Sequence, residues 1–229
     1  MNKEEFASKI VNRIYDTDLR YACVSNICYE AKEYGMRGVQ VFPTMISQCR
    51  KILKETDIKV CAVVTYPHGV FPSELKVFEA KDCIAEGADE VAVVMNGVEM
   101  NSGDYGAIEE EMRAVKEAAG GKIVKFFIET EFMKEPEIRK ACELAVETGV
   151  DYVITSTGLY NTLDEQKRDV PIQTTAEEVR LIKSIVGDKV KIQAQGNIAT
   201  YEKAKELLDA GADVICTRFA ARICDEMNG

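Results

Sequence analysis

A short pattern recurs three times in this chain at constant spacing, as AEGADEVAV, VETGVDYVI and LDAGADVIC. Each copy has a glycine at the end of a helical stretch and an aspartate before an apolar stretch. The glycines, Gly87, Gly149 and Gly211, lie 62 residues apart. That interval is about the length of two strand–helix units. The related piece EYGMRGVQV lies around Gly35. The repeat therefore predicts strands and helices that alternate evenly along the chain.

Eight short apolar segments are predicted as strands, at 13–18, 38–42, 59–64, 90–95, 123–128, 152–155, 190–194 and 213–217. Helical periodicity predicts helices at 3–11, 20–34, 73–86, 105–119, 136–148, 175–186 and 201–210. Alternation of this kind implies parallel strands with right-handed crossovers. Eight strands in 229 residues favour a single-domain (β/α)8 TIM barrel over residues 1–229. An open flavodoxin-like sheet is the alternative, and no strand is followed by the GxGxxG turn of a dinucleotide fold.

Charge and composition exclude several classes of protein. The formal net charge is −10, and no basic run offsets it, so we expect no nucleic-acid partner and no membrane partner. No apolar run approaches the ~18 residues that a membrane span needs. The eight cysteines are scattered singly without a CxxC pair, which is typical of reduced, buried thiols. These features predict a cytoplasmic protein.

In a barrel of this kind the functional groups lie at the carboxyl ends of the strands. The stretch DYVITSTG is informative here, because its first half reads as a buried strand and its second half, Thr155 to Gly158, is small and hydroxylated. Hydroxyl groups and a glycine in a turn can hold an anion. They can equally satisfy one another within the turn. Both interpretations stay open at this point.

Several motifs resemble the deoxyribose-phosphate aldolase family in order and spacing over nearly the whole chain. The motifs are EAKEYG, TYPHG, ELKVFEAKDCIAEGADEVAVVMN, SGDY, FIET, ACELAVETGVDYVITSTG and QGNIAT. The resemblance implies a (β/α)8 barrel that needs no metal and no cofactor. It also implies a lyase reaction, the cleavage of 2-deoxyribose 5-phosphate to glyceraldehyde 3-phosphate and acetaldehyde through a lysine Schiff base.

Three positions depart from the family pattern where its chemistry resides. The family reads FVKTSTG, VKASGG and DEIDMVIN, and its two lysines and its aspartate fall here on Ile154, Gln193 and Ala92. An alkyl side chain cannot form an imine. Gln193 has no charge with which to lower the pKa of a neighbouring lysine, which is the role of the family's second lysine. Ala92 has no group that can transfer a proton, which is the role of the family's aspartate. The Schiff-base chemistry is therefore expected to be lost or impaired.

The phosphate side of the family site is partly retained. Thr155, Thr157 and Gly158 keep one turn and Gly196 keeps the first glycine of a pair, whereas Asn197 replaces the second. The last turn becomes Thr217-Arg218-Phe219, without the family's serines and glycines. Arg218 is a fork of donors suited to an oxyanion if it points inward, and a solvent-facing side chain otherwise. The expected partner is a small molecule, with or without a phosphate group, and a homo-oligomer is a further option.

Other residues could substitute for the missing groups. Lys125 lies within the predicted strand 123–128, and Glu129 comes directly after that strand. Asp16 lies near the end of the first predicted strand. Glu129 could pair with Lys125 or orient a ligand. His68 is the single histidine, so a metal site is not expected. A charged loop at 159–174, which includes Lys167, is longer than the family's turn and belongs to the strand-end face.

Two hypotheses follow. In the first, the chain is a catalytically impaired homologue that binds a metabolite or a partner, a pseudoenzyme. In the second, it is still a carbon–carbon lyase, an aldehyde-lyase acting on a phosphorylated deoxy sugar through a relocated amine such as Lys125 or Lys167, or it runs another proton transfer through Glu129 or Asp16.

Overall fold

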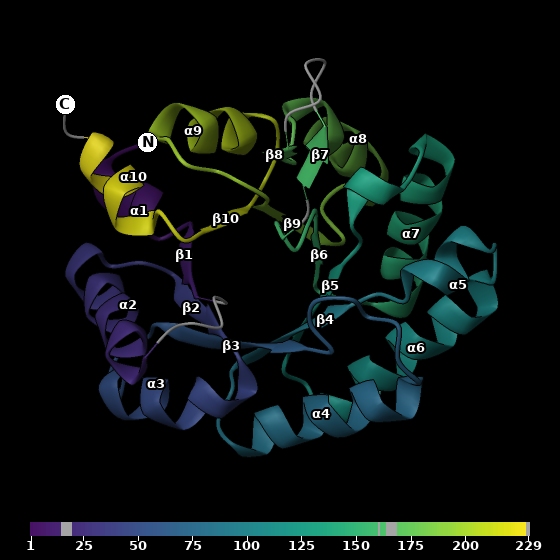
Figure 1. The fold of residues 1–229 in the computed structure, drawn as a ribbon, viewed down its shortest axis with the longest axis horizontal. Helices are drawn as coiled ribbons and strands as arrows, with labels where there is room; N and C mark the ends of the chain where they lie inside the picture. Colours follow the sequence, from purple (N-terminus) through teal and green to yellow (C-terminus); the bar gives the residue numbers. More distant parts are fainter. Residues whose placement is uncertain (15–19, 160, 164–168, 228–229) are drawn as a thin grey trace.

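The computed structural model describes residues 1–14, 20–159, 161–163 and 169–227. It contains a closed barrel of parallel strands in the order β1-β10-β9-β6-β5-β4-β3-β2, with helices around it (Figure 1). The barrel strands are β1 Ile10–Arg13, β2 Gly38–Val41, β3 Lys59–Val64, β4 Glu90–Val94, β5 Ile123–Phe127, β6 Tyr152–Ile154, β9 Lys191–Gln195 and β10 Val214–Thr217. The predicted TIM barrel is confirmed.

Helices follow most strands and cover the outside of the barrel (Figure 1). They are α1 Lys3–Ala7, α2 Tyr21–Tyr34, α3 Ile46–Ile52, α4 Ser73–Ala85, α5 Gly97–Asn101, α6 Tyr105–Ala118, α7 Glu135–Thr148, α8 Ala176–Val186, α9 Tyr201–Asp209 and α10 Ala220–Glu226, with short 3-10 turns η1 Pro43–Met45 and η2 Thr130–Phe132. Helices α3, α5 and α10 were not predicted; α5 is five residues long, and α3 and α10 are seven residues long. Within the described residues, no helix combines the length and apolar character that crossing a membrane requires.

The first strand lies earlier than predicted. The segment 13–18 was expected to be extended and the segment 3–11 helical, but α1 ends at Ala7 and β1 begins at Ile10. Ile10 and Val11 pair in parallel with Ile215 and Cys216 of β10, and both side chains are buried. Their apolar character fits a helix face as well as a strand, so the pattern alone could not separate the two. Residues 15–18 lie outside the described residues.

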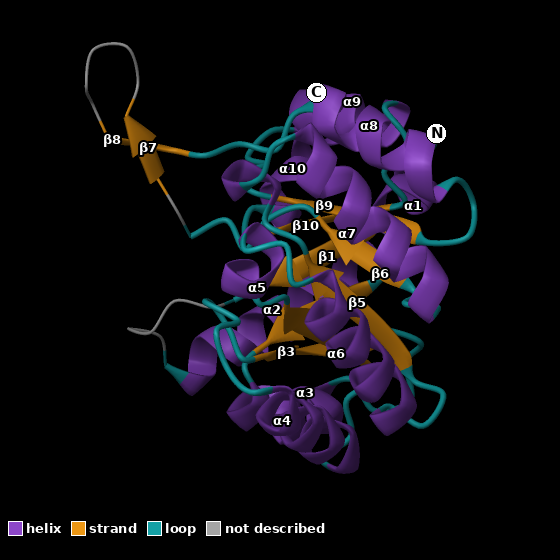
Figure 2. Cartoon of the chain, turned by 90° about the vertical axis from the view of Figure 1, so that its right-hand side faces the viewer, coloured by secondary structure: helices purple, strands orange, loops and turns teal. Residues whose placement is uncertain are grey.

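The predicted loop at 159–174 contains a small antiparallel ribbon. Strands β7 (Asn161–Leu163) and β8 (Asp169–Pro171) pair with each other and form a sheet separate from the barrel. Figure 2 shows this ribbon projecting from the body of the molecule, at the end of the barrel where α5 also lies. The insertion therefore adds a feature to the strand-end face and leaves the barrel order unchanged.

Alternation along the strands divides the core into an outer and an inner part. Outward-facing residues such as Val39, Val91 and Ile192 pack against the helices in one large cluster. Inward-facing residues form two smaller clusters. The first contains Cys61, Val63, Ala92, Val94, Phe127 and Ile154, and the second contains Val11, Tyr152, Val214 and Cys216. Since side chains fill the interior of an eight-stranded barrel, these clusters mark which residues face the axis.

One ion pair lies entirely within the helical layer. Lys76 of α4 and Glu111 of α6 are 2.6 Å apart with both side chains fully buried, and Lys76 Nζ also donates to the backbone oxygen of Val94 at 2.8 Å. The pair thereby joins two helices to the carboxyl end of β4. Removing one partner of a buried pair leaves an uncompensated charge, which is strongly destabilising.

The substitution Lys76→Met should lower the free energy of unfolding by about 3–5 kcal/mol, because Glu111 would lose its counter-ion. Urea denaturation at neutral pH measures this loss. The matched control is Arg113→Met on the same helix α6, where the pair with Glu109 is exposed. That control should cost less than about 1 kcal/mol. Equal effects in the two variants would contradict a structural role for the buried pair.

Candidate functional site

A cluster of charged side chains fills the barrel interior toward the amino-terminal ends of the strands. Lys125 Nζ lies 2.7 Å from Glu90 Oε2, and the Glu90 carboxylate also accepts two hydrogen bonds from Arg37. Burial alone would raise the pKa of Glu90, but the two cations outweigh burial and lower it to about 2. The Lys125 ammonium is also 4.7 Å from the centre of the Tyr152 ring. The expected pairing of Lys125 with Glu129 is therefore wrong, and Glu90, at the start of β4, is the partner.

Three glutamines lie next to this cluster and bond to one another. Gln193 accepts a hydrogen bond from Lys125 at 2.8 Å and donates to Gln40 at 2.8 Å. Gln40 donates to Gln195 at 3.3 Å, and Gln195 donates to the backbone oxygen of Thr157 at 3.0 Å. All three glutamines are fully buried. An amide both donates and accepts, which lets these residues connect the ammonium to the strand ends without adding charge.

The resemblance places the family's reactive groups at three positions, and two of these positions lie in an apolar layer. Ala92 and Ile154 both face the axis, in the cluster that contains Phe127. Tyr66 and Phe42 pack against this cluster, and the tilted rings of Tyr66 and Phe127 have their centres 5.9 Å apart. Gln193, the third position, is the register neighbour of Ile154. The structure thus brings the three positions together in the barrel interior.

Two carboxyl groups cover the turn that follows β6. Glu129 Oε1 accepts from the Thr157 backbone N–H at 2.6 Å, and its Oε2 accepts from the Thr157 hydroxyl at 3.0 Å. Glu131 accepts a hydrogen bond from Ser156. Burial, and next the charge of Glu131, raise the pKa of Glu129 to about 8, although the bonds from Thr157 oppose this. Burial likewise raises the pKa of Glu131.

Hydroxyl groups tie the turns after β6 and β9 together. Thr155 and Thr174 are 2.9 Å apart at their hydroxyls, and both donate to the backbone oxygen of Gln195. Gly196 has φ +128°, and a Cβ there would lie 2.9 Å from the Thr174 hydroxyl, so only glycine fits. Asn197 donates to the backbone oxygen of Ile172 at 2.7 Å. Asn197 therefore anchors the end of the inserted segment.

The turn after β10 is arranged differently from the other two. Thr217 is buried, donates to the backbone oxygen of Ile198 at 2.6 Å and accepts from the Phe219 N–H. Arg218 is exposed, and its guanidinium lies 5.0 Å from the centre of the Phe219 ring. Phe219 packs against the outer core. Of the two orientations expected for Arg218, the structure has the solvent-facing one.

Sequence reasoning missed several polar residues of this face. Gln40 was not singled out, and neither was Arg13 at the end of β1. Glu131 and Gln195 were expected only as strand-end positions, without a role. Alternation along the strands could have found Gln40 and Gln195, because each lies an even number of residues from an inward-facing neighbour. Asp16 and Lys167 lie outside the described residues. His68 is exposed at the strand-end face.

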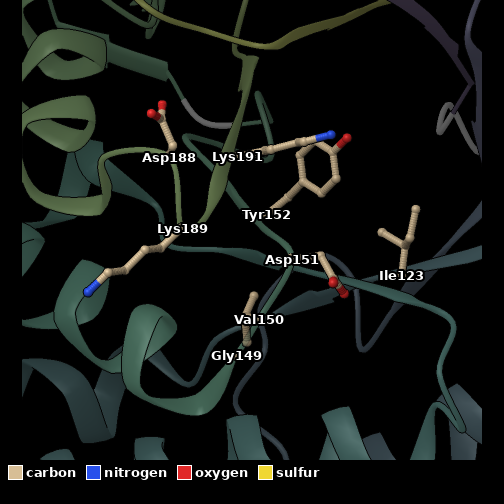
Figure 3. Close-up of a pocket in the computed structure, with 8 residues that line it drawn as sticks. All are labelled: Ile123, Gly149, Val150, Asp151, Tyr152, Asp188, Lys189 and Lys191. Carbon is tan, nitrogen blue, oxygen red and sulfur yellow. The ribbon is translucent and has the colours of Figure 1, made fainter.

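One pocket lies at each end of the barrel. Figure 3 shows one of about 230 Å³ at the amino-terminal ends of β5, β6 and β9, where Lys191 extends toward the Tyr152 ring. In this fold that end contributes stability, and the opposite end carries function. A smaller pocket of about 140 Å³ lies at the strand-end face between the loops after β3, β4 and β5, and Glu129 is among its lining residues. Within the described part of the chain, no group of three or more histidine, cysteine or acidic side chains is arranged to hold a metal ion.

Comparisons with known proteins agree with this architecture. Residues 2–194 match the sequence model of the DeoC/LacD family aldolase. A deoxyribose-phosphate aldolase of Exiguobacterium sp. is 40% identical over 190 residues, which is 82% of this chain and 81% of that protein. A crystal structure of a putative deoxyribose-phosphate aldolase from Coccidioides immitis has a TM-score of 0.92 at 28% identity, covering 100% of this chain and 88% of the other.

A second structure, a deoxyribose phosphate aldolase from Aeropyrum pernix described as a unique tetramer, has a TM-score of 0.88 at 24% identity over 100% of this chain and 93% of the other. At that identity the likeness concerns the fold. The family model, in contrast, spans most of the chain, and it agrees with the barrel and with the order of the motifs. The chain therefore belongs to the DeoC/LacD aldolase family, which includes the deoxyribose-phosphate aldolases.

Proposed function

We propose that this chain is a family member that binds a small phosphorylated metabolite at the strand-end face and does not form the family's Schiff base. The observation that carries the proposal is Ile154, which occupies the position of the family's reactive lysine. Its side chain is fully buried and packs with Ala92 and Phe127. Imine formation requires an amine, and neither the residue nor its apolar surroundings supply one.

The two supporting positions favour the same conclusion. Gln193 has no charge with which to lower the pKa of a neighbouring amine, and its carbonyl is already bonded to Lys125. Ala92 has no proton to transfer. The retained hydroxyl and glycine turns after β6 and β9 support the binding of a polar ligand without this chemistry.

A relocated amine is the competing explanation. Lys125 is the described lysine that faces the barrel interior, so it would be the new nucleophile of an active carbon–carbon lyase. Its surroundings oppose this role, because the ammonium is fully buried, paired with Glu90 and bonded to Gln193. A nucleophilic amine must be able to reach its carbonyl substrate, whereas this one is enclosed in the barrel with a carboxylate oxygen at 2.7 Å.

The assembly state stays a prediction. Several large apolar side chains are exposed on one side of the molecule, among them Phe71, Leu75 and Phe78 around the start of α4. Exposed apolar surface of this kind is typical of contacts between subunits. A homo-oligomer is accordingly part of the proposal, as is a cytoplasmic location.

A second candidate function is proton transfer by Glu129. The elevated pKa near 8 gives this carboxyl group a proton at neutral pH, and it lines the pocket of about 140 Å³ at the strand-end face. A protonated carboxyl group beside a pocket can act as a general acid. This candidate is independent of any lysine.

Borohydride trapping separates the main proposal from the relocated amine. Wild-type protein incubated with 2-deoxyribose 5-phosphate and reduced with borohydride should keep its mass, because among the described residues the lysine that faces the barrel interior, Lys125, is fully buried and paired with Glu90. Intact mass spectrometry measures this, with a deoxyribose-phosphate aldolase as the positive control. A covalent adduct mapped by peptide analysis to Lys125, or to any other lysine at the strand-end face, would overturn the proposal.

Restoring the three family residues should restore the reaction. The combined substitutions Ala92→Asp, Ile154→Lys and Gln193→Lys should raise retro-aldol activity at least about 100-fold, which is the scale of a positioned acid–base group. The new charge at position 193 would also lower the pKa of the new amine. The control keeps the first and third changes but carries Ile154→Met. A triple variant that folds and remains inactive would refute the idea that these three positions alone account for the loss.

The Glu129 carboxyl group should make stability depend on pH. Its native pKa of about 8 lies above the ordinary 4.5, so the native state binds this proton more tightly than the unfolded state. The stabilisation is complete below pH 4.5 and is lost as the pH rises toward 8. Relative to Glu129→Gln, the wild type should lose up to about 1.4 kcal/mol per pH unit in this window.

Urea denaturation at several pH values measures that difference. Ser102→Ala, on the same face and without an ionisable group, is the control and should follow the wild type. Parallel pH profiles for the wild type and Glu129→Gln would show that Glu129 holds no proton at neutral pH, and the second candidate function would then fail.

A further inference from the structure

Arg13 is the last residue of β1 and faces the barrel axis. Val11, two residues earlier, belongs to the interior cluster with Tyr152 and Val214. Asn12 between them faces outward and donates to Glu30 of α2 at 2.7 Å. Because side chains alternate along a strand, Arg13 points to the same side as Val11 but one layer nearer the strand-end mouth.

The Arg13 side chain crosses the mouth to the turn after β6. Strands β1 and β6 are separated in the barrel by β10 and β9 (Figure 1). A Cβ placed on Gly158 would nonetheless lie 3.3 Å from Arg13 Nη2 and 3.3 Å from the Cα of Gly196. The guanidinium therefore lies where the two glycine turns approach each other. Gly158 also has φ +70°, so both backbone angle and space favour glycine there.

The backbone donors of the first turn are already in use. The Thr157 N–H donates to Glu129 and the Gly158 N–H donates to Ser156 at 2.9 Å. An anion at this turn thus needs a positive group from elsewhere. Arg13 is only 9% exposed, and its guanidinium presents a planar fork of N–H donors that matches an oxyanion. In contrast, Arg218 is exposed and stacks on Phe219.

The geometry points to Arg13 as the residue that binds the anionic group of the ligand, between the glycine turns at Gly158 and Gly196. The ligand chemistry is an oxyanion, either the phosphate monoester or the carboxylate of a small metabolite, because the planar fork of arginine pairs with both. This inference rests on the proposed function and adds the specificity-determining residue. It also moves the charged contact from the turn after β10 to the end of β1.

The test is calorimetric titration of the folded protein with inorganic phosphate and, separately, with acetate. Arg13→Gln should weaken binding of the preferred anion at least about tenfold, since a charge-assisted bond is lost. Arg13→Lys keeps the charge without the fork and should give an intermediate affinity. Arg218→Gln should stay within about twofold of the wild type. Tighter binding of phosphate than of acetate identifies a phosphate monoester, and the reverse order identifies a carboxylate.

Three results would overturn the inference. They are no binding of either anion to the wild type, wild-type affinity in both Arg13 variants, or a loss that occurs in Arg218→Gln instead. If Arg13→Gln does not fold, Arg13→Lys decides, because it retains the buried charge. A lysine adduct in the borohydride experiment with unchanged dependence on Arg13 would refute the proposed loss of Schiff-base chemistry and leave this inference standing.

Discussion

The closure of eight parallel strands is the constraint on which this molecule depends. A barrel of this size has an interior that side chains alone can fill. Every inward position is therefore both a packing position and a potential reactive position. Toward the amino-terminal end of the barrel, Glu90 forms ion pairs with Lys125 and Arg37. Nearer the mouth, Ile154 and Ala92 belong to an apolar layer. A reactive amine in that layer would have to displace this packing.

This constraint also separates the residues that set the fold from the residues that face a ligand. The helical layer and the outward-facing strand residues are a separate cluster from the interior. Substitutions at Ile154 or Gln193 alter the inner clusters and leave the outer packing intact. Family membership and architecture therefore follow from most of the chain, whereas the reaction depends on a few inward side chains.

The repeat around Gly87, Gly149 and Gly211 was enough to predict the barrel, because evenly alternating strands and helices have few ways to close. The boundary of β1 was wrong since Ile10 and Val11 suit a helix face and a strand equally, and only pairing with β10 decides between them. The short helices were missed for a related reason, as five or seven residues contain too few periods to be recognised.

At the candidate site, the sequence predicted the turns at the strand ends but did not predict which side chains contact one another. Lys125 was expected near Glu129, four residues away, yet it pairs with Glu90 on the neighbouring strand. Such pairs depend on strand register, which one sequence does not reveal. Arg13 was overlooked for the same reason, because its proximity to Gly158 arises from the width of the barrel mouth and not from spacing along the chain.

The hydroxyl contact between Thr155 and Thr174 has a consequence for the length of the inserted segment. It fastens together the two places where the inserted segment leaves and rejoins the barrel. Loop-closure entropy rises only slowly with loop length. Lengthening or shortening the segment between these clamped ends therefore leaves the strands undisturbed. The length of this edge of the mouth is thereby uncoupled from the geometry of the scaffold.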